Sequence, residues 1–261
     1  MPIITPKPAL LFDIDGVVVR NQNLLGKVSN RCMNFIKLIH TKDLYPFEAQ
    51  SYNEKLYKTY GHSLKGWFVD NNIPIMADPS QSIESLYKTQ LVNMFNRYVY
   101  DDAIIMELET YLYSKEFKEA NYDFVVCQNT CAAKDIPLYL YSNAPFVWCS
   151  FVANVLNISE AHIYSSDHAL LYPQMLYKPD IQSYNNVSYD ILEQNKDVSH
   201  LVFIDDTLRN LKPIAENSTW TPLLYKPNST CSVNTSTSCG VLKNIKSITS
   251  ISEITTKLDK Y

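Results

Sequence analysis

Two aspartates one residue apart, Asp13 and Asp15, are the side chains of this sequence best placed to do chemistry. They follow an apolar run, residues 10–12, that reads as a buried strand, so both carboxylates would emerge where that strand ends. A buried carboxylate needs a cationic or hydrogen-bonding partner, and a hard divalent ion suits an Asp-x-Asp pair followed by a flexible turn at Gly16. The pair therefore predicts a metal-dependent acidic site.

Other polar groups stand at the ends of apolar runs or before a proline. They are Ser142 with Asn143 after residues 138–141, Lys178 before Pro179, and Asp205 with Asp206 after residues 201–204. Together they supply acids for a metal, an oxyanion donor and one fixed cation, which are the parts that phosphoryl transfer requires. Asp205 and Asp206 could also cap a helix that begins near Thr207, a role compatible with metal binding.

These residue types suit attack by a carboxylate on phosphorus. The attacking carboxylate and the phosphate are both negative and repel each other. Mg²⁺ together with a lysine would neutralise the charge of the phosphate. Ser142 and backbone amides would hold the equatorial oxygens. The covalent product would be an aspartyl-phosphate.

The composition bounds the class of protein. The chain has 261 residues, 46% of them hydrophobic and 19% charged, which is enough to bury a sizeable core. A formal net charge of -4 argues against nucleic-acid binding, and no apolar run reaches membrane-spanning length. We see no secretory signal, and the six cysteines are scattered without a Cys-x-x-Cys pair. We therefore expect a cytoplasmic protein with free thiols and no zinc.

Four short apolar runs predict the strands of one sheet: residues 8–12, 138–141, 201–204 and 223–225. Because they alternate with helical stretches, they predict an α/β core with a Rossmann-like parallel sheet and active groups at the carboxyl ends of its strands. Residues 228–240 are rich in Ser, Thr and Asn and predict a surface loop. The apolar residues from Val241 to Ile254 then predict a closing strand or helix.

The segment between the first two runs has a helical pattern. Its apolar residues recur at helical spacing, for example at Val28, Cys32 and Phe35. We expect residues 21–134 to form an inserted helical cap domain over the sheet's edge, and residues 1–20 and 135–261 to form the α/β core domain. The alternative is a separate helical domain packed elsewhere.

The order of the polar motifs resembles the haloacid dehalogenase-like (HAD) phosphatase superfamily from about Leu10 to Tyr225. Further stretches resemble its pyrimidine 5′-nucleotidase group: residues 141–144, 155–158, 166–167, 203–210 and, in the insert, 57–66. The chain departs from that group at Gly16-Val17, which is typical of sugar-phosphate phosphatases and phosphomutases. Trp148 and Phe151 stand where the group has His and Arg.

The resemblance implies a role for each motif residue. Asp13 would be the nucleophile, and Asp15 the general acid/base that also lends a backbone carbonyl to Mg²⁺. Asp206 would bind the metal directly, and Asp205 directly or through water. The substrate would be held by Ser142, Asn143, Lys178, Tyr60 and Gly61, although Tyr60, Gly61 and Gly66 could instead form a tight turn between helices. His62 and His168 are expected at the surface.

Our hypothesis is a Mg²⁺-dependent phosphatase that acts on a small phosphorylated metabolite, preferably a pyrimidine nucleoside 5′-monophosphate. The alternatives are a sugar-phosphate phosphatase, a phosphomutase of the β-phosphoglucomutase kind, and a non-catalytic binding protein with the same fold. We expect no nucleic-acid or membrane partner, and a monomer or homodimer.

Overall fold

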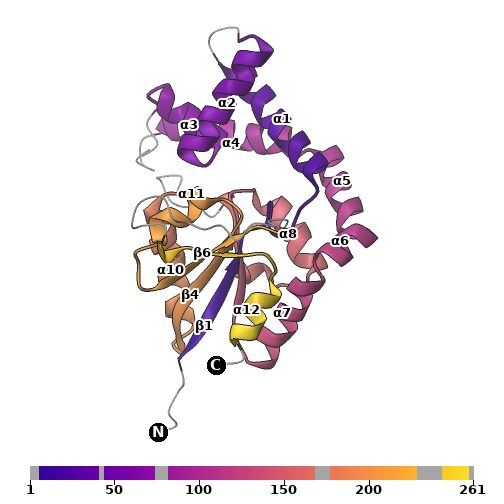
Figure 1. Cartoon of the computed structure of the whole chain (residues 1–261). Helices are drawn as coiled ribbons and strands as arrows, with labels where there is room; N and C mark the ends of the chain where they lie inside the picture. The colour runs from indigo at the N-terminus through magenta and orange to yellow at the C-terminus, as the bar shows by residue number, and fades with distance from the viewer. Residues whose placement is uncertain (1–5, 41–43, 74–81, 168–176, 228–242, 259–261) are drawn as a thin grey trace.

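A six-stranded parallel sheet lies at the centre of the computed structural model, which describes residues 6–40, 44–73, 82–167, 177–227 and 243–258 (Figure 1). The strand order is β3-β2-β1-β4-β5-β6, so the first strand in sequence lies inside the sheet. The strands are β1 (Lys7–Phe12), β2 (Leu138–Tyr141), β3 (Ile163–Tyr164), β4 (Val198–Asp205), β5 (Trp220–Tyr225) and β6 (Lys246–Ile248). The predicted α/β parallel sheet is confirmed.

Strand β1 pairs with β2 on one side and β4 on the other, and its side chains alternate between two cores. Leu10 and Phe12 belong to a core shared with three helices, α7 (Tyr122–Ala133), α8 (Phe146–Val155) and α12 (Ser252–Leu258). Ala9 and Leu11 belong to a second core shared with α10 (Ile181–Gln194). Both faces of the sheet are therefore covered by helices, and for this reason β1 reads as an unbroken apolar run. Pro8 is tolerated next to a shift in register between Lys7 and Pro8.

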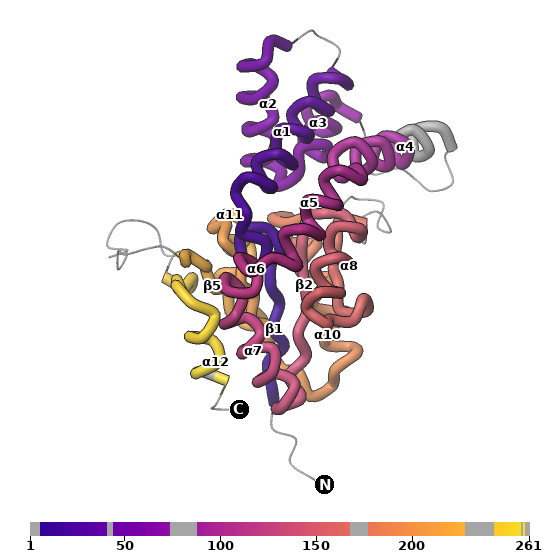
Figure 2. Tube along the Cα trace, turned by 90° about the vertical axis from the view of Figure 1, so that its right-hand side faces the viewer, coloured from indigo at the N-terminus to yellow at the C-terminus, as the bar shows by residue number. Residues whose placement is uncertain are grey.

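The helices lie in two places (Figures 1 and 2). Helices α1 to α4 stand above the carboxyl ends of the strands, while α5, α6 and α7 descend along the sheet. Their bounds are α1 (Gln22–Ile39), α2 (Pro46–Tyr60), α3 (Ser63–Asp70), α4 (Ser82–Val99), α5 (Asp102–Leu112), α6 (Lys115–Ala120) and α7 (Tyr122–Ala133). The second half of the chain adds α8 (Phe146–Val155), η1 (Glu160–His162), α10 (Ile181–Gln194), α11 (Leu208–Leu211), η2 (Lys212–Ile214) and α12 (Ser252–Leu258).

The segment between β1 and β2 thus has two parts. Helices α1 to α4 form a roof above the carboxyl ends of the strands, and α7 packs against the sheet. In α7, the ring of Phe124 lies edge-on to that of Phe12, with 4.8 Å between centroids. The division into a core of residues 1–20 and 135–261 and a cap of residues 21–134 stays a prediction.

Local sequence explains where the roof helices begin and end. The Asn21 side chain caps α1 by accepting a hydrogen bond from the Leu24 backbone N–H at 3.0 Å. Pro46 opens α2, whose C-cap Gly61 has a left-handed backbone with φ of 78°. The turn at Gly61 leads into α3 and brings this part of the roof down onto the sheet.

The end of the chain contains both of the expected kinds of closing element, β6 and then α12. The predicted loop over residues 228–240, Val241 and His168 lie outside the described residues. Within the described part of the chain, no helix combines the length and apolar character that crossing a membrane requires.

Candidate active site

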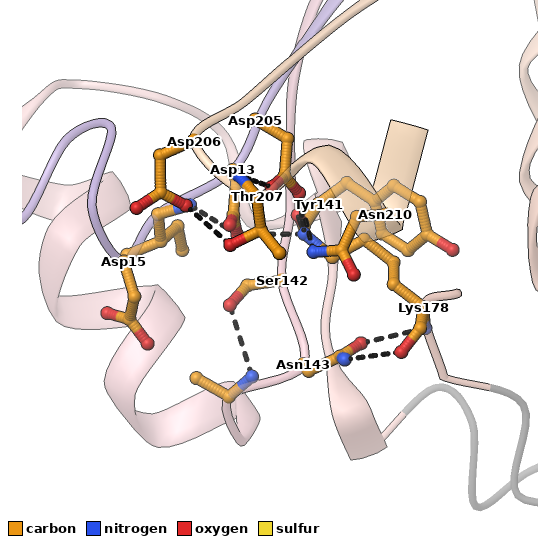
Figure 3. A network of polar contacts seen from close by, with 12 residues as sticks. Asp13, Asp15, Tyr141, Ser142, Asn143, Lys178, Asp205, Asp206, Thr207 and Asn210 are labelled. Atoms are coloured by element: carbon orange, nitrogen blue, oxygen red, sulfur yellow. Dashed lines mark hydrogen bonds and ion pairs between the residues drawn. The ribbon is translucent and has the colours of Figure 1, made fainter. Parts of the chain in front are cut away.

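The predicted polar residues come together above the carboxyl ends of neighbouring strands (Figure 3). Asp13 follows β1, Ser142 follows β2, and Asp205 ends β4. Lys178 reaches the same place from the turn that precedes α10. Since β2, β1 and β4 are adjacent, the parallel sheet itself brings these side chains together.

Lys178 is the electrostatic centre of the site. Its side chain is 1% exposed, and its Nζ lies 2.9 Å from Asp13 Oδ1 and 3.0 Å from Asp205 Oδ2. The Nζ also donates to the backbone carbonyl of Tyr141 at 2.9 Å. One buried cation therefore bridges two buried carboxylates.

Asp205 is fixed from several sides. Its Oδ1 accepts from the Thr207 backbone N–H at 2.7 Å, and its Oδ2 accepts from Asn210 Nδ2 at 2.9 Å as well as from Lys178. The bond to Thr207 ties Asp205 to the N-cap residue of α11, but no side-chain hydrogen bond caps this helix, so the structure does not support the capping interpretation. Asp206 accepts a hydrogen bond from the Thr207 hydroxyl at 3.0 Å.

Three carboxylates form a possible cation site. Asp13, Asp205 and Asp206 each offer a ligand oxygen, and these oxygens lie within 4.8 Å of one another. Oxygen-only donors of this charge suit a hard divalent cation such as Mg²⁺. The Asp15 carboxylate is not part of this cluster, so its predicted contribution to a metal is limited to its backbone carbonyl.

The proton affinities in the site are strongly perturbed. Burial raises the pKa of Asp13, against the opposing effect of Lys178, and burial with the neighbouring Asp205 raises the pKa of Asp206. Burial alone would lower the pKa of Lys178, but the charges of Asp13 and Asp205 raise it above its usual range. The lysine therefore stays charged, and the crowded carboxylates favour any added positive charge.

Asp15 lies apart from the ion-paired group and has a different partner. Burial raises the pKa of its carboxyl to about 6, and a hydrogen bond from Trp148 opposes the rise. That bond runs from the indole Nε1–H to Asp15 Oδ1 at 3.0 Å. A carboxyl with a pKa near neutrality can both give and take a proton.

Gly16 is required by the packing of the site. Its φ is 87°, and a Cβ at this position would lie 2.0 Å from Asp206 Oδ2. The glycine after the two aspartates therefore gives room to a candidate metal ligand.

Ser142 and Asn143 have different surroundings, although both line the cavity. The Ser142 Oγ accepts from the Ala144 backbone N–H at 3.1 Å, and its own O–H donates to no described residue, so it can donate to a ligand. The Asn143 amide is committed within the protein: Nδ2 donates to the carbonyls of Gly61 and Lys178, and Oδ1 accepts from the Lys178 N–H. Asn143 thus links the C-terminal end of α2 to the turn that carries Lys178. The sequence predicted a substrate contact for Asn143 and did not predict this link.

The two predicted roof residues also differ. Gly61 lines the cavity, whereas Tyr60 is not among the lining residues, and its hydroxyl donates to Asp70 at 3.0 Å. A Cβ on Gly66 would lie 2.7 Å from the Tyr60 ring. The structure thus brings Gly61 to the site and does not bring Tyr60, which packs between α2 and α3.

The site opens into a cavity of about 400 Å³, within the range usual for small-molecule sites. Its floor is formed by the sheet-end residues and its roof by side chains from α1, α2 and α4 and the α2–α3 turn. Among roof residues not predicted from sequence are Leu25, Val28, Asn53, Tyr57, His62, Phe95 and Tyr100. Val28 and Phe95 belong to apolar faces at helical spacing, and Tyr57 and His62 lie in the stretch 57–66 that carries part of the family resemblance. No local motif marks Leu25, Asn53 or Tyr100.

No family model and no curated protein matches this sequence. A HAD hydrolase of family IA from Entamoeba histolytica is similar over 98% of this chain and 100% of its own, with 15% identity and a TM-score of 0.50. The HAD hydrolase YfnB from Bacillus subtilis, solved with magnesium, covers 98% and 100% at 13% identity with a TM-score of 0.49. A HAD hydrolase from Deinococcus radiodurans, solved with phosphate and sodium, covers 98% and 96% at 14% identity with a TM-score of 0.48. The Entamoeba structure shows that this chain has the HAD-hydrolase fold, so the superfamily resemblance is confirmed for the fold.

Proposed function

We propose that this chain is a Mg²⁺-dependent phosphatase that hydrolyses a small phosphomonoester through a phosphoryl group carried on Asp13. The observation that carries the proposal is the Asp13 carboxylate, ion-paired with buried Lys178 beside two further carboxylates on the floor of a cavity. A structural ion pair alone would not need a third acid beside the two carboxylates that Lys178 contacts. A site that receives a cation and a phosphate does.

Asp13 is the proposed nucleophile. Its Oδ1 accepts from the Ile14 backbone N–H at 2.8 Å and faces Lys178, so the carboxylate is held and its charge is partly balanced. Attack forms an O–P bond to Asp13 and breaks the bond from phosphorus to the leaving alcohol. The Ser142 hydroxyl and Lys178 hold the phosphoryl oxygens, whose charge is then shared with fixed donors.

Asp15 is the proposed general acid and base. In its protonated form it gives a proton to the leaving alkoxide, and in its ionised form it removes a proton from the water that hydrolyses the aspartyl-phosphate. A pKa near 6 suits both directions, because neither form is strongly disfavoured around neutral pH. Trp148 donates its indole N–H to Asp15 Oδ1 and thereby orients the Asp15 carboxyl.

Mg²⁺ would be held by Asp13, Asp205 and Asp206, with the Asp15 backbone carbonyl as a further ligand. When bound, it supplies positive charge that offsets the repulsion between the carboxylates and a phosphate.

The substrate preference is the finer part of the proposal. We favour a nucleoside 5′-monophosphate, with a pyrimidine base, on the basis of the sequence resemblance. Gly16, which suggested a sugar-phosphate phosphatase or a phosphomutase, is explained by its contact with Asp206 and favours neither. We further propose that residues 21–134 act as a cap that excludes water, and that the protein is cytoplasmic.

The test is phosphate release from a panel of nucleotides and sugar phosphates, with and without Mg²⁺. Asp13→Asn is the control, because it keeps the shape and removes the nucleophilic charge. We expect release that requires Mg²⁺ and is abolished in the variant. Release that survives Asp13→Asn would sink the mechanism, and isomerisation of a sugar phosphate without release would identify a mutase.

A further inference from the structure

The roof of the cavity contains a polar group without a protein partner. Asn53, in the third turn of α2, is 6% exposed and lines the cavity. Its Oδ1 has no hydrogen-bond partner among the described residues. Buried acceptors are nearly always satisfied, so an unpaired one on a cavity wall points to a ligand that donates to it.

The surroundings of Asn53 limit the chemistry of that ligand. Leu25, Val28 and Phe95 contribute apolar and aromatic surface to the same cavity. Such walls favour a neutral group with apolar or flat faces.

The charged roof residues do not provide a second anion site. Of the charged side chains that α2 contributes to the lining, Lys58 Nζ lies 3.2 Å from Glu54 Oε2, and both are exposed. The other cation that lines the cavity in the described chain is Lys178, which is already shared by Asp13 and Asp205. A leaving group with a second negative charge would therefore find no unpaired lysine or arginine among the described residues that line the cavity.

We propose that Asn53 determines the specificity of this site by accepting a hydrogen bond from the leaving group of the substrate. The substrate class is a phosphomonoester of an uncharged alcohol that carries an N–H or O–H donor away from its phosphate. The inference rests on the proposed phosphatase function and assigns the part of the substrate that is not transferred. Asn53 takes no part in bond making or breaking.

The experiment compares substrates that differ in a single donor. Uridine 5′-monophosphate and its N3-methyl analogue are assayed with Mg²⁺ on the wild type and on Asn53→Leu, and p-nitrophenyl phosphate serves as a donor-free reference. The wild type should prefer the unmethylated nucleotide by about 10- to 100-fold in kcat/KM, the usual range for one buried hydrogen bond. In Asn53→Leu that ratio should fall toward the small preference that the methyl group's size alone imposes.

Two further variants separate the hydrogen bond from packing. Asn53→Asp keeps an acceptor oxygen and should retain the preference for the N–H substrate. Asn34→Leu, on an exposed position of α1 outside the cavity lining, should keep the wild-type ratio. A ratio does not depend on the fraction of folded enzyme, so a partly unstable variant still gives an answer.

The failures are distinguishable. An equal rate on both nucleotides in the wild type, or an unchanged ratio in Asn53→Leu, overturns the role of Asn53 while release from p-nitrophenyl phosphate upholds the phosphatase. No Mg²⁺-dependent release from any of the three compounds overturns the proposed function, and with it the inference that rests on it.

Discussion

At the scale of single residues, Lys178 holds the site together. It is the buried cation that Asp13 and Asp205 share, and both carboxylates are buried with it. Removing one member of such a group destabilises the protein more than replacing the whole group by apolar residues, because the remaining charges stay buried without compensation. The lysine therefore contributes to stability as well as to the proposed chemistry.

Lys178→Met tests this contribution. The change keeps most of the side-chain volume and leaves two buried carboxylates facing each other. We expect the free energy of unfolding, measured by urea titration in EDTA at pH 7.5, to fall by about 3–5 kcal/mol. Added Mg²⁺ should restore part of the loss without restoring activity. Wild-type stability in EDTA would show that the ion pairs are not needed.

Trp148 is the residue whose importance only the structure reveals. Trp148→Phe removes the N–H that contacts Asp15 and keeps an aromatic ring next to Tyr100, whose centroid lies 5.5 Å from the Trp148 ring. We expect kcat to fall by about tenfold or more with little change in KM, since a hydrogen bond to a charged group is worth roughly 1.5–3 kcal/mol. Steady-state kinetics on one good substrate measures the split. A rise in KM alone would place Trp148 in binding rather than in positioning Asp15.

At the scale of elements, the turn between α2 and α3 meets the turn that carries Lys178. A Cβ on Gly61 would lie 1.8 Å from the Lys178 carbonyl oxygen and 2.7 Å from Pro179 Cδ. The Asn143 side chain donates to the carbonyls on both sides of this contact. The roof and Lys178 are thus positioned by the same contact.

Gly61→Ala should separate these two elements. The new methyl group meets backbone, and a left-handed φ already costs alanine about 1–2 kcal/mol. We expect a lower melting temperature together with at least a tenfold loss in kcat/KM. The matched control is Gly26→Ala in α1, where a Cβ meets nothing within 4 Å and the helix should gain up to about 1 kcal/mol. Equal behaviour of the two variants would contradict the proposed coupling.

At the scale of the whole molecule, several contacts hold the roof against the core. Lys65 of α3 pairs with Asp180 at 3.3 Å, and the ring of His62 stacks on Tyr177 with centroids 4.5 Å apart. Burial, with a smaller effect of the Lys65 charge, lowers the pKa of His62 to about 3. This interface therefore requires a neutral histidine.

The stability of the molecule should consequently fall in acid. His62 has a pKa near 6.5 when unfolded and about 3 when folded, so between these values the unfolded chain binds the extra proton. Stability is present above pH 6.5 and declines as the pH falls below it. His62→Asn keeps a cap acceptor for the Lys65 N–H and cannot titrate in this range. The unfolding free energy of the wild type relative to this variant should be constant above pH 7 and should shrink toward pH 4.5, and a constant difference throughout would refute the assignment.

The sequence predicted those features that depend on neighbours along the chain. Apolar runs predicted four of the strands, and the site residues that immediately follow three of them lie where expected. Strand β3 was missed because its two residues carry too little pattern, and β6 was expected only as a closing strand or helix without defined bounds. The pairing of Trp148 with Asp15 and the free acceptor of Asn53 depend on how distant helices pack. His62, expected at the surface, is partly covered by Tyr177 and Phe95, so that expectation was wrong.

The central claim is that a phosphoryl group resides on Asp13 during turnover. The most direct test is acid quenching of the enzyme during turnover with Mg²⁺ and a hydrolysed substrate, followed by peptide mass spectrometry. We expect one phosphoryl group on Asp13, which hydroxylamine should remove because it cleaves acyl phosphates. With p-nitrophenyl phosphate, whose leaving group needs no proton, it should accumulate further in Asp15→Asn, where activation of water is removed. Continued turnover with no phosphoryl group on Asp13 in either protein would contradict the account.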